Sequence, residues 1–303
     1  MPLILGAQSA VAGGFSVDNS CRFNGVDSTL TKTYGGAGNV DKWTLSMWIK
    51  RSDGYLSQNI FEGGSGTTYT MIRYQGGGAT YPNAILFENY VGAVLKGQIK
   101  TLAGWRDQSA YYHFVFVWDS GNASAGDRMR IYVNGAELTS LGTDVNPAQD
   151  QDSSICAAVL HEIGGAGSEP FNGYMAQLAL CDGQTYTPSD FGEFNEDTPT
   201  IWQPIDISGL TFGTNGFYLD FGDSADLGAD VSGNANDYAE NNLAAIDQCT
   251  DTPTNNFATW NPLIPNYTVA NNATYEEGNC YSETTTTGGL GGISTIGSDV
   301  SKW

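Results

Sequence analysis

Runs of alternating apolar and polar residues recur along the first two thirds of the chain. The run WTLSMWIKRS divides its side chains between two faces: Trp43, Leu45, Met47 and Ile49 on one, Thr44, Ser46, Trp48 and Lys50 on the other. A period of two is typical of a strand that is buried on one face, and Trp48 alone interrupts the polar face. Similar runs follow at intervals of about ten residues with glycine-rich breaks between them, which predicts a β-sandwich or barrel.

The run YYHFVFVWD is apolar at both alternating sets of positions. This pattern predicts a central strand that is covered on both faces. We expect Trp43, Phe116 and Trp118 in the core and His113 bonded within the sheet. The next run contains Asn134-Gly135, a strong signal for a type I′ hairpin turn with its partner strand over residues 136–139.

The composition also favours strands over helices. Hydrophobic residues make up 40% of the chain, aromatic residues 12% and charged residues 15%, and there are 39 glycines. This balance predicts an ordered core built from many short strands and tight turns. One short helix is expected in TYTPSDFGEF, where Thr187 or Ser189 can cap the helix and Pro188 suits its first turn.

Charge is distributed unevenly along the chain. The net charge is −21, yet eleven of the twelve Lys and Arg residues lie in residues 1–130. Nucleic-acid binding and attachment to an anionic membrane both need cationic patches, so the sequence argues against them. The acidic remainder is interpreted as a solubilising surface, with a site for several cations as the alternative.

The cysteines, the histidines and the N-terminus exclude several other classes. The five cysteines lack CxxC spacing, and neither His113 nor His161 has a partner at zinc-ligand spacing. No basic region precedes the apolar residues near the N-terminus, and no apolar run of about 18 residues occurs. We therefore expect no zinc site, no signal peptide and no membrane insertion.

Changes in amino-acid composition along the chain suggest four segments. Residues 1–14 form a leader or anchor, and residues 15–196 form the sandwich. Residues 197–282 are rich in Asn, Asp, Thr and Gly and predict a loop-rich β arm or small domain, with a hairpin in GLTFGTNGFYLDFGD. Residues 283–303 are interpreted as a linker and the start of a further domain.

Three stretches together resemble the laminin-G-like, concanavalin A-like lectin family. They are WTLSMWIKRSD with QNIFEGG, then YYHFVFVWD with DRMRIYVNGAEL, then IGGAGSEPFNGYMAQLALCDGQTYTPSDF. The resemblance covers residues 15–195 and implies a jelly-roll β-sandwich that closes at a short helix. The leader MPLILG and the segment from GFYLDFGD to NNFATWNPL resemble virion proteins of tailed bacteriophages, especially those of marine hosts.

That second resemblance implies a place on the virion surface after assembly in the host cytoplasm. The first functional hypothesis is a tail fibre or fibre-like protein whose lectin-like domain attaches to host-surface glycans. The second is a capsid or tail decoration or adaptor protein with a purely structural sandwich. Expected partners are other virion proteins, a host glycan and further copies of the chain in a homo-oligomer.

Catalytic chemistry finds little support in the sequence. Glycoside hydrolases of this jelly roll carry an ExDxxE strand, which is missing, and the nearest candidate, Glu193 to Asp197, is interpreted as a solvated helix end. No nucleophile elbow or phosphate-binding glycine loop occurs. We therefore expect a non-enzymatic protein.

Two binding sites remain as hypotheses. Sugar binding needs aromatic faces near strand ends or loops, and the candidates are Tyr69, Tyr81, Tyr90 and Trp105, each of which could instead belong to the core. Calcium prefers hard oxygen ligands, and one loop gathers Asp223, Asp226, Asp230, Asn234, Asn236 and Asp237. The alternative for that loop is a set of Asx turns, in which each side chain satisfies nearby backbone.

Overall fold

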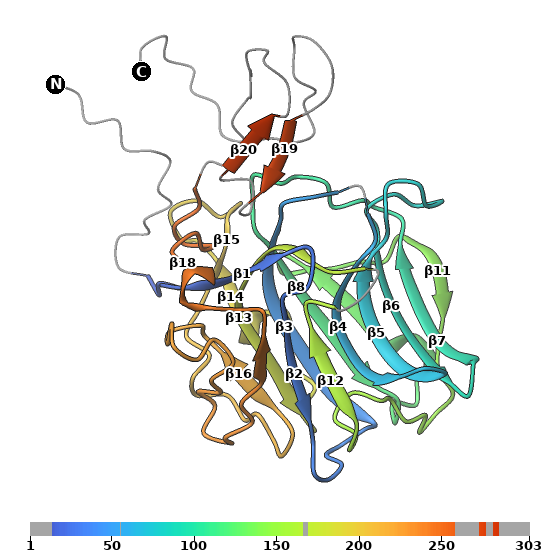
Figure 1. Ribbon diagram of the computed structural model, residues 1–303. Coiled ribbons are helices and arrows are strands. Elements are labelled where there is room, and N and C mark those ends of the chain that lie inside the picture. Colours follow the sequence, from blue (N-terminus) through green and yellow to red (C-terminus); the bar gives the residue numbers. More distant parts are fainter. Residues whose placement is uncertain (1–13, 55, 166–168, 258–272, 277–280, 285–303) are drawn as a thin grey trace, which may run out of the picture.

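A computed structural model describes the chain as two antiparallel sheets of eight strands each (Figure 1). It describes residues 14–54, 56–165, 169–257, 273–276 and 281–284. Residues 1–13 of the leader and most of residues 258–303, Cys280 included, lie outside the described residues, and so do the predictions made for them. No helix among the described residues is long and apolar enough to span a membrane.

The first sheet has the order β10-β9-β8-β3-β13-β1-β18, and β16 also pairs with β13. Its strands are β1 (Ser20–Asn24), β3 (Lys42–Arg51), β8 (Tyr112–Asp119), β9 (Met129–Val133), β10 (Ala136–Glu137), β13 (Asn172–Asp182), β16 (Phe217–Leu219) and β18 (Gln248–Cys249). The strand β8 lies between β3 and β9, so the predicted central strand is confirmed.

The second sheet has the order β11-β7-β6-β5-β4-β12-β2-β17. Its strands are β2 (Thr29–Thr33), β4 (Gln58–Ser65), β5 (Thr68–Tyr74), β6 (Ile85–Val91), β7 (Val94–Thr101), β11 (Leu141–Val145), β12 (Leu160–Ile163) and β17 (Ala239–Asn241). The predicted run NAILFENYVGAVL divides into β6 and β7, because Gly92 and Ala93 both adopt positive φ and turn the chain.

Short elements complete the described fold. Two separate hairpins form from β14 (Gly192–Phe194) with β15 (Trp202–Pro204) and from β19 (Ala273–Glu276) with β20 (Tyr281–Thr284). Single 3-10 turns are η1 (Ala125–Asp127), η2 (Pro188–Asp190) and η3 (Ala245–Asp247). The predicted helix after the sandwich is therefore one turn, η2, and the Thr187 backbone N–H donates to the Asp190 carboxylate at its start.

The two sheets enclose an aromatic core. Trp43, Phe116 and Trp118 are fully buried, and the rings of Trp43 and Trp118 stack with centroids 6.4 Å apart. The predicted hairpin is also confirmed: Asn134 and Gly135 have φ of 47° and 83°, and β10 pairs with β9 after them. Two positive φ values are what a type I′ turn requires.

The segment of residues 197–257, called the arm below, covers much of the outer face of the first sheet, together with Val17 and residues 184–191. Thr44, Ser46, Trp48 and Lys50 are all buried as a result, so the expected polar face of β3 is a second buried surface. Trp48 packs there with Val17, Tyr111, Tyr174 and Ala176. Farther along that face, a separate cluster joins Val115, Val117, Ala179, Cys181 and Phe191 to Ile207, Phe212 and Tyr218 of the arm.

The arm has no hydrophobic core of its own among the described residues. Its β16, β17 and β18 extend the two sheets, and its side chains Phe217, Leu219, Phe221, Leu227 and Tyr238 belong to the central core. The expected hairpin over residues 209–223 is absent, because its only strand, β16, pairs with β13 instead. Within the described residues, the arm is rich in loops and completes the sandwich.

Candidate functional site

The outer face of the second sheet carries a row of carboxylates that only the strand register brings together. Glu62 of β4 lies directly opposite Glu162 of β12 on one side and Met71 of β5 on the other. Met71 is opposite Glu88 of β6, and Glu88 is opposite Gln98 of β7. Residues directly opposite in an antiparallel pair share a face. Glu162, Glu62 and Glu88 therefore form one line across four strands, called the carboxylate row.

Beside the carboxylate row, the same face carries a pair of stacked tyrosines. Tyr69 is opposite Tyr90, and their ring centroids are 5.2 Å apart with an interplanar angle of 26°. Gly64 and Leu95 are the next residues in this line, and Gly64 adds no side chain beside Tyr69. Both rings are partly exposed. Burial together with the charge of Glu88 raises the pKa of Tyr69 to about 12, so its hydroxyl stays protonated at neutral pH.

Glu88 is buried, and two neighbours compensate its charge. The Gln98 amide donates to Glu88 at 2.8 Å, and an Arg73 guanidinium nitrogen lies 3.9 Å from the other carboxylate oxygen. Arg73 also binds Glu169 at 2.7 Å. The one arginine of this region is thus engaged by two carboxylates.

Glu62 is half-buried and makes no hydrogen bond or ion pair with the described part of the chain. Burial and the opposing charge of Glu162 raise the pKa of Glu62 to about 7, and Arg73 lowers it only in part. The group therefore exists as both acid and carboxylate near neutral pH. In either form it presents hydrogen-bonding capacity that residues 14–54, 56–165 and 169–257 leave unused.

The four predicted sugar-binding aromatics separate into three places. Tyr69 and Tyr90 meet in the stack described above. Trp105 packs edge-on against Tyr112 and Phe114 at the margin of the core. The Tyr81 ring lies against Gly142 of β11. Trp105 thus packs against the core, which was the alternative to sugar binding. Of the four side chains, only Tyr69 and Tyr90 contact each other.

The predicted calcium loop is organised by Asx turns. Asp230 accepts the backbone N–H groups of Tyr218, Ser232 and Asn236, and Asp223 accepts that of Ala225. The amides of Asn234 and Asn236 both donate to the Gly216 carbonyl, and Asp226 is exposed. Among the described residues, no group of three or more His, Cys, Asp or Glu side chains is arranged to hold a metal. These contacts favour the structural alternative for the loop.

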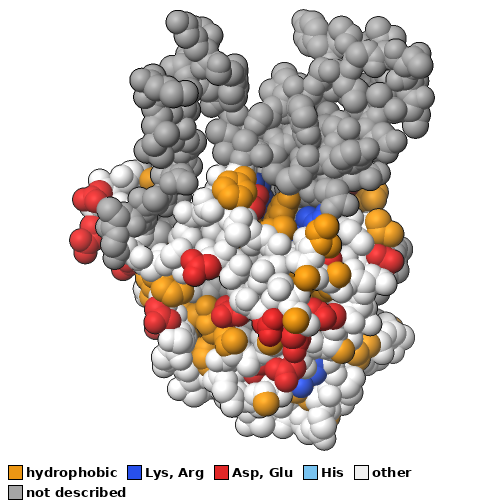
Figure 2. All heavy atoms as spheres, turned by 60° about the vertical axis from the view of Figure 1, so that its left-hand side comes forward, with side chains coloured by type: hydrophobic (Ala, Val, Ile, Leu, Met, Phe, Trp, Pro, Cys, Tyr) orange, Lys and Arg blue, Asp and Glu red, His pale blue; other side chains and the backbone are white. Residues whose placement is uncertain are grey.

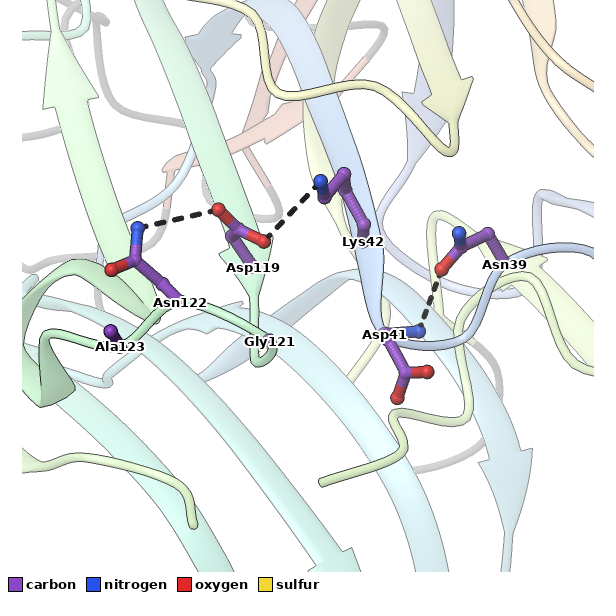
Figure 3. Close-up of a pocket in the computed structure, with 7 residues that line it drawn as sticks. All are labelled: Asn39, Asp41, Lys42, Asp119, Gly121, Asn122 and Ala123. Carbon is purple, nitrogen blue, oxygen red and sulfur yellow. Dashed lines mark hydrogen bonds and ion pairs between the residues drawn. The ribbon is translucent and has the colours of Figure 1, made fainter. Parts of the chain in front are cut away.

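A polar pocket of about 400 Å³ opens beside the loop that joins β2 to β3 (Figure 3). Lys42 Nζ and Asp119 Oδ1 face each other at 3.8 Å, Asn122 donates to Asp119, and the Asp41 backbone N–H donates to Asn39. Burial and Asp152 raise the pKa of Asp41. The polar groups mostly satisfy one another, and no aromatic ring lines the pocket. It is a weaker candidate for sugar binding than the outer face.

The two histidines hold structural positions in the described fold. His113 is buried between the rings of Trp48 and Trp202, accepts the Trp202 indole N–H at Nδ1 and bonds Ser46 of β3 through Nε2. His161 accepts the Cys156 backbone N–H at Nε2. The thiols of Cys21, Cys156 and Cys181 are buried and form no disulfide within the described part of the chain. The bonding of His113 to a neighbouring strand was predicted.

Glu193 does not lie at a helix end, as expected from the sequence, but in β14, where it is opposite Gln203. Glu193 and Asp197 are both exposed, and the Glu193 carboxylate accepts the Gln203 amide within the β14–β15 hairpin. The carboxylate row, in contrast, was not predicted from the sequence. Its signal is a single glutamate inside each of three alternating runs, QNIFEGG, ILFENYV and LHEI, but only the register shows that these residues are neighbours.

A family comparison agrees with this architecture. The sequence of residues 24–189, more than half of the chain, matches the concanavalin A-like lectin/glucanases superfamily. The chain belongs to this superfamily. The match ends within η2, so it covers the sandwich and leaves out the arm. A comparison with curated proteins finds no match.

Solved structures that resemble this superfamily member have low sequence identity to it. A heptameric SAP-like pentraxin from Limulus polyphemus is 18% identical over 58% of this chain and 82% of its own, with a TM-score of 0.41. A Bacteroides ovatus protein whose name proposes carbohydrate binding is 15% identical over 76% and 60%, with a TM-score of 0.48. Domains LG4-5 of mouse laminin alpha1 are 13% identical over 65% and 48%, with a TM-score of 0.40.

Proposed function

We propose that this superfamily member is a glycan-binding protein and that the sugar lies on the outer face of the second sheet. The observation that carries the proposal is the partly exposed Tyr69–Tyr90 stack beside the carboxylate row. Aromatic faces pack against the apolar side of a pyranose ring, and carboxylates accept hydrogen bonds from its hydroxyls. The two kinds of group lie in neighbouring lines of one rigid sheet.

Several features suit this face to binding without large rearrangement. Tyr69 and Tyr90 hold each other in place, so little side-chain entropy is lost when a ligand packs on them. Glu88 is fixed by Gln98 and Arg73. Glu62 keeps its hydrogen-bonding capacity for a ligand. Strand residues place these groups more precisely than mobile loops would.

The biological setting that we propose is a virion surface. The resemblance of the arm to virion proteins of tailed bacteriophages supports a tail fibre or fibre-like protein that attaches to a host-surface glycan. Asp206, Asp223, Asp226 and Asp237 of the arm are exposed. Figure 2 shows acidic side chains spread over the face turned toward the viewer. Such a surface stays soluble in a salt-rich medium, where charges are screened within a few ångströms.

A decoration or adaptor role is the second candidate, and exposed apolar side chains favour it. Ile246 is 77% exposed, and Phe194, Ile201, Val231 and Phe257 are each at least 44% exposed. All five lie in residues 194–257, where they could contact capsid or tail subunits. Locating the chain in a particle reconstruction separates the two roles: an adaptor buries this region between subunits, whereas an adhesin presents the outer face of the second sheet to solvent.

A glycan array tests the binding function directly. The proposal expects binding to a defined set of glycans, and loss of that binding when Tyr90 is replaced by alanine. Absence of binding to every glycan, together with normal adsorption of particles that lack the protein, would dispose of the adhesin. The same glycans are assayed for reducing-sugar release, because Glu62 and Glu162 lie opposite each other. We expect no release, and release that Glu62→Gln abolishes would make the chain a hydrolase.

A further inference from the structure

Three buried carboxylates elsewhere in the described fold are each held by partners, and one of them, Asp182, accepts the backbone N–H groups of Asn39 and Asn215. Asp247 binds Arg22 at 2.7 Å, and Asp251 binds Lys50 at 2.8 Å. Such pairing is expected, because an unpaired charge in a buried position is costly. Glu62 differs from all three, since it is half-buried and has neither a cation within ion-pair distance nor a hydrogen-bond donor among the described residues.

The groups that surround Glu62 make its region strongly negative. Glu162 faces it from β12, Glu88 from β6, and Glu169 from the segment after β12. Within the described part of the chain, Arg73 of β5 is the cation that lowers the pKa of Glu62, and Arg73 is already engaged by Glu88 and Glu169. A ligand that brings a positive charge to Glu62 would relieve this repulsion, whereas a ligand that brings a negative charge would add to it.

The same position lies within reach of the tyrosine stack. Glu62 is opposite Met71, which is two residues from Tyr69 along β5. Two residues of a strand span about 7 Å, so a short oligosaccharide on the two tyrosines also passes Glu62.

Resting on the glycan-binding function proposed above, we propose that the ligand carries free amino groups: a glycan with 2-amino-2-deoxy sugars that are not N-acetylated. The sugar ring packs on Tyr69 and Tyr90, and the ammonium group donates to the carboxylate of Glu62. Half-burial strengthens this charged hydrogen bond relative to one in bulk water. Uronic-acid and sulfated glycans are disfavoured, because they meet the carboxylate row with like charge.

Calorimetric titration of the full chain at pH 7 tests the proposal with three tetrasaccharides: glucosamine, N-acetylglucosamine and galacturonic acid. The wild-type chain is expected to bind the glucosamine oligomer at least tenfold more tightly than the acetylated one and to bind the galacturonic acid oligomer most weakly. Glu62→Gln is expected to bring the first two within about threefold of each other. Glu193→Gln, a matched change at an exposed glutamate on the β14–β15 hairpin, is expected to keep the wild-type ratio.

Two results would overturn the proposed preference for free amino sugars without affecting the proposal that the chain binds glycans. One is equal or tighter binding of the acetylated oligomer by the wild-type chain, and the other is an unchanged ratio in Glu62→Gln. Both assume that some glycan binds and that Tyr90→Ala weakens it. If no glycan on the array binds, the proposed function itself fails, and the preference fails with it.

Discussion

The ammonium group of Lys50 lies 2.8 Å from the carboxylate of Asp251, which follows it by 201 residues. Both side chains are buried, with 1% and 5% of their surface exposed. Lys50 also donates to the Asn256 side chain and the Phe257 carbonyl, each at 2.8 Å. One lysine on the outer face of β3 therefore holds the end of the arm at three points.

Breaking this pair should be far more costly than breaking an exposed one. Asp251→Asn leaves the Lys50 ammonium buried without its counter-ion, and we expect a loss of about 3–5 kcal/mol in the free energy of unfolding. The control is Asp119→Asn, whose partner Lys42 lies 3.8 Å away and is 41% exposed, with an expected loss of at most about 1 kcal/mol. Urea unfolding followed by tryptophan fluorescence measures both. Equal losses would mean that the buried pair does not anchor the arm.

A chain that ends at residue 196 should not fold. Without the arm, the central core loses Phe217, Leu219 and Tyr238, and apolar side chains such as Val115 and Val117 of β8 face water. We expect aggregation or a spectrum with poorly dispersed amide resonances, whereas residues 14–257 should give a dispersed spectrum. A soluble, cooperatively unfolding chain of residues 15–196 would instead support the domain boundary after residue 196 that the change in composition suggests.

Glu62 should make the protein less stable as the pH rises past neutrality. Its pKa is about 7 in the folded chain and about 4.5 in the unfolded chain. Because the folded state holds the proton more tightly, this contribution is fully present below pH 4.5 and is lost as the pH rises through 7. Glu62→Gln removes the effect. We therefore expect the free energy of unfolding of the variant, relative to that of wild type, to be about 1–2 kcal/mol higher at pH 8 than at pH 5. An equal difference in unfolding free energy at both pH values would contradict this.

The two histidines should stay neutral in mild acid and carry their protons on different ring nitrogens. His113 accepts the Trp202 N–H at Nδ1, so its proton is on Nε2, whereas His161 accepts a backbone N–H at Nε2, so its proton is on Nδ1. Burial lowers the pKa of His113 to about 3 and that of His161 to about 4. Nitrogen NMR of the ring atoms at pH 5 should show these two tautomers. Titration near pH 6.5 would contradict the burial of both rings.

The same shifts make the fold sensitive to acid. In the unfolded chain both histidines bind protons below about pH 6.5, while in the folded chain they remain neutral until much lower pH. Their contribution to stability is therefore constant above pH 6.5 and falls as the pH decreases toward 3. Unfolding midpoints in urea should fall over this interval.

Local patterns in the sequence predicted much of the sandwich. Alternation located β3, a run that is apolar on both faces located β8, and Asn134-Gly135 located the hairpin, because each signal depends only on adjacent residues. The burial of the outer face of β3 could not be predicted in this way. Thr44, Ser46 and Lys50 are polar as on an exposed face, but they are buried because they bond to distant partners such as Gln184, His113 and Asp251.

The candidate site depended even more on long-range pairing. Tyr69 and Tyr90 were expected near strand ends, yet their contact follows from the register of β5 with β6. Glu62 and Glu162 are neighbours only because β12 inserts between β4 and β2. A single sequence contains no signal for that insertion, so the carboxylate row could be found only in the folded chain.

Glycan binding by the outer face of the second sheet is tested most directly by one set of titrations. A glycan selected on the array is titrated into wild type, into Tyr69→Ala with Tyr90→Ala, and into Phe194→Ala, a control that removes an aromatic ring 50% exposed on the β14–β15 hairpin. We predict that the double variant loses at least tenfold in affinity and that the control binds as wild type does. Equal affinities in all three proteins would place the sugar elsewhere and contradict the proposed site.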